Sequence, residues 1–444
     1  MRHTLLAAAL LVCTASHASG LLEAYQQALE NDPTLRAARY EREAGRMAPA
    51  IARAALLPNV SFSASRSGNQ GDRSLAPGAP AQDLKYRSAQ DTLSLRQALY
   101  NGEANARYQQ GTVQAEYSEL VFLKKQDDLA VRVAGAYFDL LLAAEKLAFA
   151  NAEVNAFSAQ QTSAERRYTA GEGTVTEIAE ASARGAIAEA NRADATDLLL
   201  VARQALQAMT GQPALGLQVL KPGFAPSVLQ PDNPDTWTTL ALDQNPELAA
   251  QRKLVESTRL DIQRSRAGHL PRLDLVASVS KSTSDSLTTL NQQSTVRSLG
   301  VQLTIPLFSG LGVVSQTDQA QANLQRVQAE LDASSLKVQL EVRRWFLATR
   351  TGIAKVAAYE RAVESSRVAV EGTQRGMAAG IRTQTEVLDA ERQYFSALRD
   401  RAQARYELLN NRLKLKATAG ALDTADIAEV DALLEPLVTV SKKP

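Results

Sequence analysis

The sequence is poor in the side chains that perform most protein chemistry. Its 444 residues include one cysteine and three histidines, and 5% of them are aromatic. The first 18 residues, which we expect to be cleaved off, contain Cys13, His3 and His17. The mature chain would therefore have no cysteine and one histidine, His269. One imidazole without a thiol cannot form a Cys/His pair or a histidine-rich metal cage, and a Ser/His/acid triad would depend on His269 alone. We therefore expect no catalytic site, no bound metal and no cofactor.

The first residues have the pattern of a secretory signal peptide, and the rest of the chain lacks long hydrophobic runs. A charged start (1–3) precedes an apolar run (5–12) and a small-x-small cleavage site (16–18). This predicts a signal peptide over 1–18 and a mature chain that begins at Ser19. The apolar run is too short for a membrane helix, and no later stretch reaches the roughly 20 uncharged residues that such a helix needs.

A dominant charge and phosphate-binding loops are also missing. Lys and Arg total 49 against 48 Asp and Glu, and both signs are interspersed along the chain. We therefore expect no nucleic-acid partner, and nothing resembles a glycine-rich loop that would cradle phosphate. Abundant alanine with few aromatic residues suits long, closely packed helices better than one bulky globular core.

The chain does contain a second copy of its own landmarks. Pro33, for example, is matched by Pro246, 213 residues later. The matching stretches are 32–35 with 245–248, 57–58 with 270–271, 93–102 with 301–310, and 170–177 with 379–386. A period this long implies two similar structural units rather than a short-period solenoid. We expect a first repeat over 19–221, a second repeat over 222–424 and a C-terminal tail over 425–444.

Each repeat contains segments that predict helices of unusual length. No proline occurs between 102 and 170, so one helix can run for roughly 69 residues, on the order of 100 Å at 1.5 Å per residue. Apolar residues within it recur at heptad spacing, which favours helices packed side by side. The predicted long helices are 102–170, 174–209, 311–378 and 383–417. The turns between them contain Gly171 and Gly380, where glycine can adopt the left-handed backbone that ends a helix.

Two short stretches in each repeat alternate between apolar and polar residues, which predicts strands with one apolar face. The predicted strands lie near 59–66, 91–100, 272–280 and 296–307, and Gly/Ser/Pro/Asn-rich segments over 67–83 and 280–294 predict long hairpin loops. Four strands of about nine residues are long enough to cross a bilayer, but lipid tolerates no open sheet edge. Membrane barrels begin at about eight strands, so copies of the chain would have to share one. The alternation alone leaves open two ordinary hairpins that cap a water-soluble helical protein.

Taken in order, these features resemble the TolC family of outer-membrane channel-tunnels over nearly the whole mature chain. The matching stretches are 24–28 with 32–33, 56–58, 136–138, Arg167-Tyr-Thr-Ala-Gly171, 269–271, Ile305-Pro-Leu-Phe-x-Gly310 and Arg382-Thr-x-x-Glu-Val-Leu-Asp-Ala390. The resemblance implies a mainly α-helical chain with a membrane β-barrel portion. Three chains would form one 12-stranded β-barrel, with four strands per chain, continuous with a long periplasmic α-helical barrel. It further implies contact with outer-membrane lipid, a periplasmic adaptor (a membrane fusion protein) and an inner-membrane pump, either an ABC transporter or proton-driven.

Residue by residue, the resemblance assigns a gate to the helical turns. Glu386 and Asp389 share one helix face and match the family's acidic constriction, with glutamate at 386 where aspartate is more familiar. The repeat register adds Glu177 and Glu180 at the equivalent places of the first repeat. We therefore expect a cluster of four carboxylates per chain at the periplasmic entrance, crowded enough to raise some pKa values and to attract multivalent cations.

Other family positions concern the closed state and docking. The matching residues are Thr176, Glu177 and Arg382 for closed-state links, and Gly171 and Gly380 for adaptor-docking turns. The resemblance implies a link between Arg382 and Glu177. Met377 stands where the family usually has a tyrosine, so the closed state is expected to rely on one charge-assisted contact instead of two. Glu172 and Ile381 follow the two glycines, so the two turns differ in polarity.

Three classes of function follow from these observations. The favoured one is a trimeric outer-membrane exit duct of a tripartite export system, which passes proteins or small molecules from an inner-membrane pump to the exterior. The sequence does not separate type I protein secretion from efflux, although Cys13 lacks the context of a lipid anchor, which leans toward secretion. The alternative is a periplasmic coiled-coil adaptor or scaffold protein without a membrane barrel. A secreted enzyme is the third class and depends on His269.

Overall fold

The computed structural model describes residues 20–74, 76–78, 80–213, 218–221, 223–284 and 292–436. The predicted signal peptide and the last eight residues of the predicted tail lie outside these ranges. The chain divides into two compact units. We call the first the helical unit, formed by Met1–Arg39, Leu123–Pro246 and Ser335–Pro444, and the second the sheet unit, formed by Tyr40–Phe122 and Glu247–Ser334.

The sheet unit contains a four-stranded antiparallel sheet with the order β1-β2-β4-β5. Its strands are β1 (Asn59–Arg73), β2 (Gln82–Tyr100), β4 (Arg272–Ser284) and β5 (Gln292–Thr304). Each repeat contributes one hairpin, and β2 pairs with β4, so the sheet joins the two repeats. Two helices, each followed by a short 3-10 turn, precede the hairpins: α3 (Ala48–Arg53) with η1 (Ala54–Leu56) before β1, and α7 (Pro246–Arg266) with η2 (Ala267–His269) before β4.

The strands extend beyond their expected ends on the hairpin side, into segments that the sequence predicts as loops, whereas β5 ends at Thr304 and not at the expected 307. Strand β1 continues to Arg73, which pairs with Gln82 at the start of β2. Glycine, serine and asparagine in 67–73 signal a turn by composition, but here the backbone ladder continues through them, and Ser67 and Ser88 share a hydroxyl hydrogen bond of 2.6 Å. Composition therefore underestimated the strand lengths.

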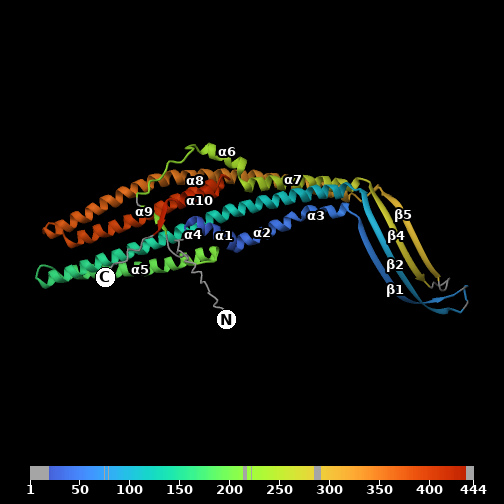
Figure 1. Ribbon diagram of the computed structural model, residues 1–444, viewed down its shortest axis with the longest axis horizontal. Helices are drawn as coiled ribbons and strands as arrows, with labels where there is room; N and C mark the ends of the chain where they lie inside the picture. Colours follow the sequence, from blue (N-terminus) through green and yellow to red (C-terminus); the bar gives the residue numbers. More distant parts are fainter. Residues whose placement is uncertain are drawn as a thin grey trace, which may run out of the picture. The chain divides into compact units, whose positions relative to one another are not determined.

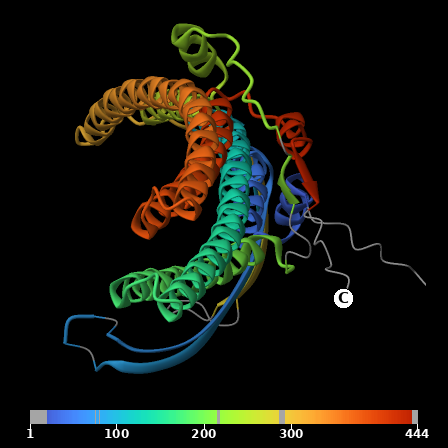
Figure 2. The ribbon, with the colours of Figure 1, turned by 90° about the vertical axis from the view of Figure 1, so that its left-hand side faces the viewer.

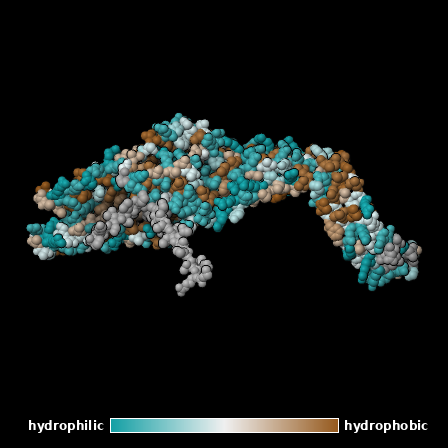
Figure 3. Space-filling view, viewed as in Figure 1, coloured by the Kyte–Doolittle hydropathy of each residue, from teal (hydrophilic) through white to brown (hydrophobic). Residues whose placement is uncertain are grey.

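The two faces of the sheet differ in chemistry because successive side chains of a strand point to opposite sides. One face, which we call the apolar face, carries rows such as Val60, Leu95, Ala277 and Leu299, which lie opposite one another across all four strands. In Figure 3 hydrophobic residues gather over the part of the sheet where β1 and β4 begin, and hydrophilic residues cover the part nearest the hairpin ends. Large apolar side chains are strongly exposed here, with Leu299 at 77%.

The opposite side, which we call the hydroxyl face, carries serine and threonine at the alternate positions. Their side chains hydrogen-bond in pairs across neighbouring strands, at 2.6 to 3.1 Å: Ser61 with Ser94, Ser67 with Ser88, Thr92 with Ser280, Ser278 with Ser298, and Ser282 with Ser294. Cross-strand hydroxyl pairs of this kind stabilise neighbouring strands. One face of the sheet is therefore suited to an apolar environment and the other to water.

The helical unit contains two long helical hairpins (Figures 1 and 2). Their helices are α4 (Gly102–Thr169) with α5 (Val175–Thr210), and α8 (Gly312–Ala378) with α9 (Gln384–Thr418). Helices α4 and α8 begin in the sheet unit and have 68 and 67 residues. The turns of both hairpins lie at the same end of this unit (Figure 1). These bounds agree with the predicted long helices to within one or two residues.

Apolar contacts hold the long helices of this unit together. Phe157 of α4, Ala188 of α5 and Leu388 of α9 form one buried cluster, so the two hairpins pack against each other. Small alanine side chains permit this close approach, which agrees with the composition. Among the helices of the described residues, none is long and apolar enough to cross a bilayer.

The chain also contains shorter elements. They are α1 (Leu21–Asn31), α2 (Pro33–Arg46), β3 (Gln218–Leu220), α6 (Pro234–Gln244), α10 (Thr424–Asp431) and β6 (Leu434–Pro436). The Asn31 amide donates to the carbonyl of Thr210 at 2.9 Å, and the Asn245 amide donates to the carbonyl of Thr418 at 2.8 Å. The same kind of bond thus holds the end of each returning helix. The region expected as a tail from 425 contains part of α10 and all of β6, which pairs with β3.

Candidate functional site

The two turns that join the long helices are built alike. Gly171 and Gly380 have φ angles of 81° and 75°, in the left-handed region that favours glycine. The backbone N–H of Glu172 donates to the carbonyl of Arg167 at 2.9 Å. In the second turn the N–H of Ile381 donates to the carbonyl of Gly376, also five residues earlier, at 2.9 Å. These bonds satisfy the last carbonyl groups of α4 and α8. The turns are therefore defined structures whose next residues, Glu172 and Ile381, are exposed.

Each returning helix begins with a capping box. The hydroxyl of Thr174 accepts from the backbone N–H of Glu177 at 3.3 Å, and the Thr174 N–H donates to the Glu177 carboxylate at 3.4 Å. In the second hairpin the Thr383 hydroxyl accepts from the Glu386 N–H at 3.3 Å, and the Thr383 N–H donates to the Glu386 carboxylate at 2.8 Å. Glu177 and Glu386 therefore start their helices, a role that the sequence reading missed. The signal was present as Thr-x-x-Glu at both places.

The carboxylate of Glu386 is held in its charged form. Besides the hydrogen bond from the capping N–H, it accepts one from Arg382, four residues earlier in the turn, at 2.9 Å. The backbone N–H of Thr383, then the side chain of Arg382, lower the pKa of Glu386. Within one chain, crowding of the four carboxylates therefore does not raise the pKa of this residue. The hydrogen bonds from these two donors outweigh the opposing effect of desolvation on the pKa.

The expected link between Arg382 and Glu177 is not formed within the described part of one chain. Arg382 is occupied by Glu386, and Glu177 instead lies 3.7 Å from Arg167 of α4. Thr176 is exposed. A link between Arg382 and Glu177 would therefore have to form with another copy or in another state.

The structure brings Glu180 and Asp389 together through an arginine that the sequence reading missed. The Arg184 guanidinium lies 2.8 Å from the Asp389 carboxylate and 3.6 Å from that of Glu180. Glu180 also accepts a hydrogen bond from the Thr385 hydroxyl at 3.0 Å. Helix α5 of one hairpin is thus joined to α9 of the other. The spacing of Glu180 and Arg184, one helical turn apart, was the only local signal for this cluster.

A buried polar layer lies on the first two turns of α9. Gln384 is 2% exposed, accepts a hydrogen bond from Arg167 and donates to the Gln160 carbonyl at 3.3 Å. Glu391 is 5% exposed and accepts hydrogen bonds from Gln160 and Gln374, both at 3.0 Å. Burial raises the pKa of Glu391. Amide side chains from α4 and α8 therefore bind a single carboxyl group on α9.

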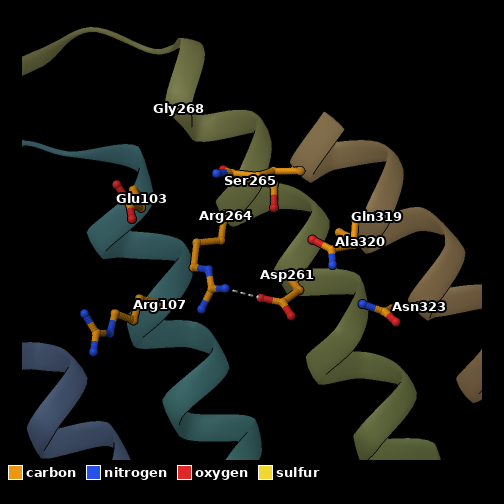
Figure 4. Close-up of a pocket in the computed structure, with 10 residues that line it drawn as sticks. Glu103, Arg107, Asp261, Arg264, Ser265, Gly268, Gln319, Ala320 and Asn323 are labelled. Carbon is orange, nitrogen blue, oxygen red and sulfur yellow. Dashed lines mark ion pairs between the residues drawn. The ribbon is translucent and has the colours of Figure 1, made fainter. Parts of the chain in front are cut away.

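The sheet unit contains a polar hollow of about 440 Å³ between α4, α7 and α8 (Figure 4). Glu103 and Arg107 line it from α4, and Asp261 and Arg264 from α7. Arg264 and Asp261 form an ion pair of 2.9 Å, so the charges of this hollow are largely balanced. Within the described ranges, no group of three or more His, Cys, Asp or Glu residues could hold a metal ion. His269 is exposed at the end of η2.

Comparison with known proteins assigns the family. Residues 24–212 and 237–421 each match the family model described as outer membrane efflux protein. The chain belongs to the outer membrane efflux protein family. The resemblance to the TolC family is therefore confirmed, and this family member is an outer-membrane protein that projects into the periplasm.

Individual relatives of this efflux-family protein cover nearly its whole length. It is 37% identical over 419 residues to the alkaline protease secretion protein AprF of Pseudomonas aeruginosa, which covers 94% of this chain and 87% of AprF. It is also 37% identical over 438 residues to the proteases secretion protein PrtF of Dickeya chrysanthemi, and this match covers 96% of the present chain and 94% of PrtF. The solved structure of the outer membrane protein VceC from Vibrio cholerae has the same fold, with a TM-score of 0.76 at 18% identity. The match covers 90% of the present chain and 96% of VceC. These relatives are secretion and outer-membrane proteins.

Proposed function

We propose that the protein is the outer-membrane exit duct of a tripartite export system for type I secretion of proteins. The observation that carries the proposal is a four-stranded sheet with one apolar face, one hydroxyl face and two open edges, β1 and β5. Protein substrates are favoured over small molecules because AprF and PrtF are both named for protease secretion. The periplasmic adaptor or scaffold alternative gives no role to such a sheet.

The proposed barrel follows from the open edges. In lipid every backbone polar group must be satisfied, so β1 and β5 need partners. Three chains with four strands each supply 12 strands, an even number within the range of membrane barrels. Arg66, Asp91, Lys281 and Arg297 lie on the apolar face toward the hairpin ends, where they would meet lipid head groups. The hydroxyl face would then line a water-filled interior.

The helical unit also offers surfaces for sister copies. Helix α5 exposes Ile187 at 63% and Val201 at 60%, and α8 exposes Leu336 at 61% and Leu340 at 68%. Apolar stripes this exposed mark protein interfaces. We propose that α8 of one chain packs beside α5 of the next, which would close a ring of helices. An adaptor, linked to an inner-membrane ABC or proton-driven pump, would bind the turns at Gly171 and Gly380.

The entrance of this duct would be controlled by the helical turns. In a trimer the four carboxylates of each chain, Glu177, Glu180, Glu386 and Asp389, would be repeated three times around the opening. Each has an arginine within 4 Å in its own chain, so the constriction would consist of paired charges rather than bare carboxylates. Arg382 would exchange Glu386 for Glu177 of a neighbouring chain when the entrance closes.

The proposal is tested by fractionation followed by planar-bilayer recording of the purified oligomer. We expect a heat-modifiable oligomer in the outer membrane that forms channels of low conductance, which added trivalent cations block. Replacing Glu386 and Asp389 together by alanine removes two negative charges per chain, so the half-blocking concentration should rise about tenfold or more. Glu247→Ala, a carboxylate far from the turns in sequence, serves as the matched control. Unchanged block in the double variant contradicts the assigned entrance, and absence of any channel contradicts the duct.

A further inference from the structure

The two hairpins of one chain are joined near their turns by a contact that the family resemblance does not assign. Arg184 on α5 reaches Asp389 on α9 at 2.8 Å. Beside it, the Thr385 hydroxyl on α9 donates to Glu180 on α5 at 3.0 Å. Two adjacent polar contacts therefore connect the first hairpin to the second within the same chain.

Arg184 differs from the other arginines beside these carboxylates. Arg382, in the turn before α9, and Arg392 on α9 pair with Glu386 and Asp389 of the same hairpin, and Arg167 faces Glu177 of its own hairpin. Of these four arginines, Arg184 alone contacts a carboxylate of the other hairpin. A contact between two separate elements opposes their separation, whereas a contact within one helix does not.

The surroundings of Arg184 favour a persistent ion pair. Its side chain is 19% exposed, compared with 55% for Arg382 and 65% for Arg392. Glu180, one helical turn before it, lies 3.6 Å away and holds the guanidinium over Asp389. Partial burial lowers screening by salt, and a guanidinium already positioned by one carboxylate loses less entropy on binding a second.

We infer that Arg184 is a closed-state link, which holds the α4–α5 hairpin to the α8–α9 hairpin through Asp389 and keeps the entrance narrow. The inference rests on the proposed function, because the hairpins must move apart for an entrance at their turns to widen. It also accounts for Met377. Where the family usually has a tyrosine in the closed-state network, this chain holds its hairpins with an arginine eight residues along the helix from Thr176.

The link assigns a second role to Asp389. This carboxylate belongs to the proposed constriction, but its charge is compensated by Arg184 as long as the hairpins stay together. Separation of the hairpins would release Asp389 and Glu180 at the same moment. Opening would therefore expose two carboxylates per chain that are paired in the closed state.

The test is the closed-state conductance of purified oligomers in planar bilayers at fixed voltage. Arg184→Gln, which keeps most of the side-chain length and removes the charge, should raise this conductance about fivefold, since three partly buried ion pairs are lost per oligomer. Arg392→Gln is the matched control, because Arg392 is an exposed arginine that pairs with Asp389 within one helix; its conductance should change less than twofold. The closed-state conductance of Arg184→Lys should lie between those of Arg184→Gln and Arg392→Gln.

A charge exchange decides between a link and a general loss of stability. Arg184→Asp combined with Asp389→Arg rebuilds the pair in reverse and should return the conductance to within twofold of the original, while each single change leaks. Each variant must run as an oligomer without heating, and if Arg184→Gln fails to assemble, Asp389→Asn breaks the same contact from the other side. Arg184→Gln and Asp389→Asn channels that both stay closed, while Arg382→Ser leaks, overturn the link but leave the duct intact. The duct itself fails only if the original protein forms no channel.

Discussion

Leu299→Arg is expected to remove most of the protein from the outer membrane. Leu299 lies on the apolar face of β5, is 77% exposed and belongs to the row formed with Val60, Leu95 and Ala277. An arginine on the lipid face costs up to about 2–4 kcal/mol, the value at the bilayer midplane, and the proposed trimer would carry three more of them. The amount of unheated oligomer in the outer-membrane fraction should therefore fall at least tenfold.

The adjacent residue provides the control. Ser298 is on the hydroxyl face, where it shares a hydrogen bond of 2.7 Å with Ser278. Ser298→Arg places the same side chain one position along the same strand, but on the face that we expect to meet water. Its oligomer should remain within about twofold of the original amount. Equal losses in Leu299→Arg and Ser298→Arg would show that the two faces do not differ in their environment.

The stability of the helical unit is expected to depend on pH through Glu391, with a sign opposite to that of an exposed carboxylate. Burial raises the pKa of Glu391, so its neutral form is favoured in the folded protein. Its contribution to stability is therefore complete below the pKa of the unfolded chain, near 4.5, and is lost as the pH rises through the folded value. Glu391→Gln cannot ionise and should unfold at a higher temperature than the original protein at pH 8, but not at pH 4.

Two further variants make this a sharp comparison. Glu391→Ala leaves the buried amides of Gln160 and Gln374 without their acceptor and creates a cavity, so it should lower the free energy of unfolding by about 2–4 kcal/mol at either pH. Glu386→Gln is the matched exposed change. Because the pKa of Glu386 is lowered, its contribution is present above 4.5 and lost as the pH falls, so this variant should be less stable at pH 8 and unchanged at low pH.

Thermal unfolding of the oligomer in detergent, followed by circular dichroism at both pH values, measures all three variants. If Glu391→Gln and Glu386→Gln shift the midpoint in the same direction at pH 8, the carboxyl group of Glu391 is not buried as described. A shift of Glu391→Gln that is the same at pH 4 and pH 8 would contradict its raised pKa.

The long helices could be predicted closely because local signals mark their ends. Gly171 and Gly380 end the outgoing helices, and the two Thr-x-x-Glu boxes begin the returning ones. These signals need no knowledge of tertiary structure. Strand positions were also predictable from alternation, but their lengths were not, since Gly, Ser and Asn within 67–73 indicate a loop whenever the partner strand is unknown.

Contacts between the repeats were beyond the reach of the sequence alone. The pairing of β2 with β4 and the ion pair of Arg184 with Asp389 each join residues about 200 positions apart. Gln384 and Glu391 are polar residues on a helix, which composition places on a solvated surface, yet both are buried. Only the packing of α9 between α4 and α8 brings Gln160 and Gln374 to Glu391.

The most direct test of the shared sheet is a disulfide between β1 of one chain and β5 of the next. The mature chain is expected to have no cysteine, so Ser61→Cys can be combined with Ser298→Cys, Gly300→Cys or Gln302→Cys, which together sample the unknown register between copies. Within a chain β1 and β5 are separated by two strands, roughly 14 Å at the usual strand spacing, which is too far for a disulfide.

After mild oxidation in membranes and full denaturation, at least one of these pairs should give covalent dimers and trimers that reductant converts to single chains. Variants with only one of the two cysteines should give only single chains after the same treatment. If every pair yields only single chains, while the protein remains in the outer membrane, then sister copies do not complete the sheet.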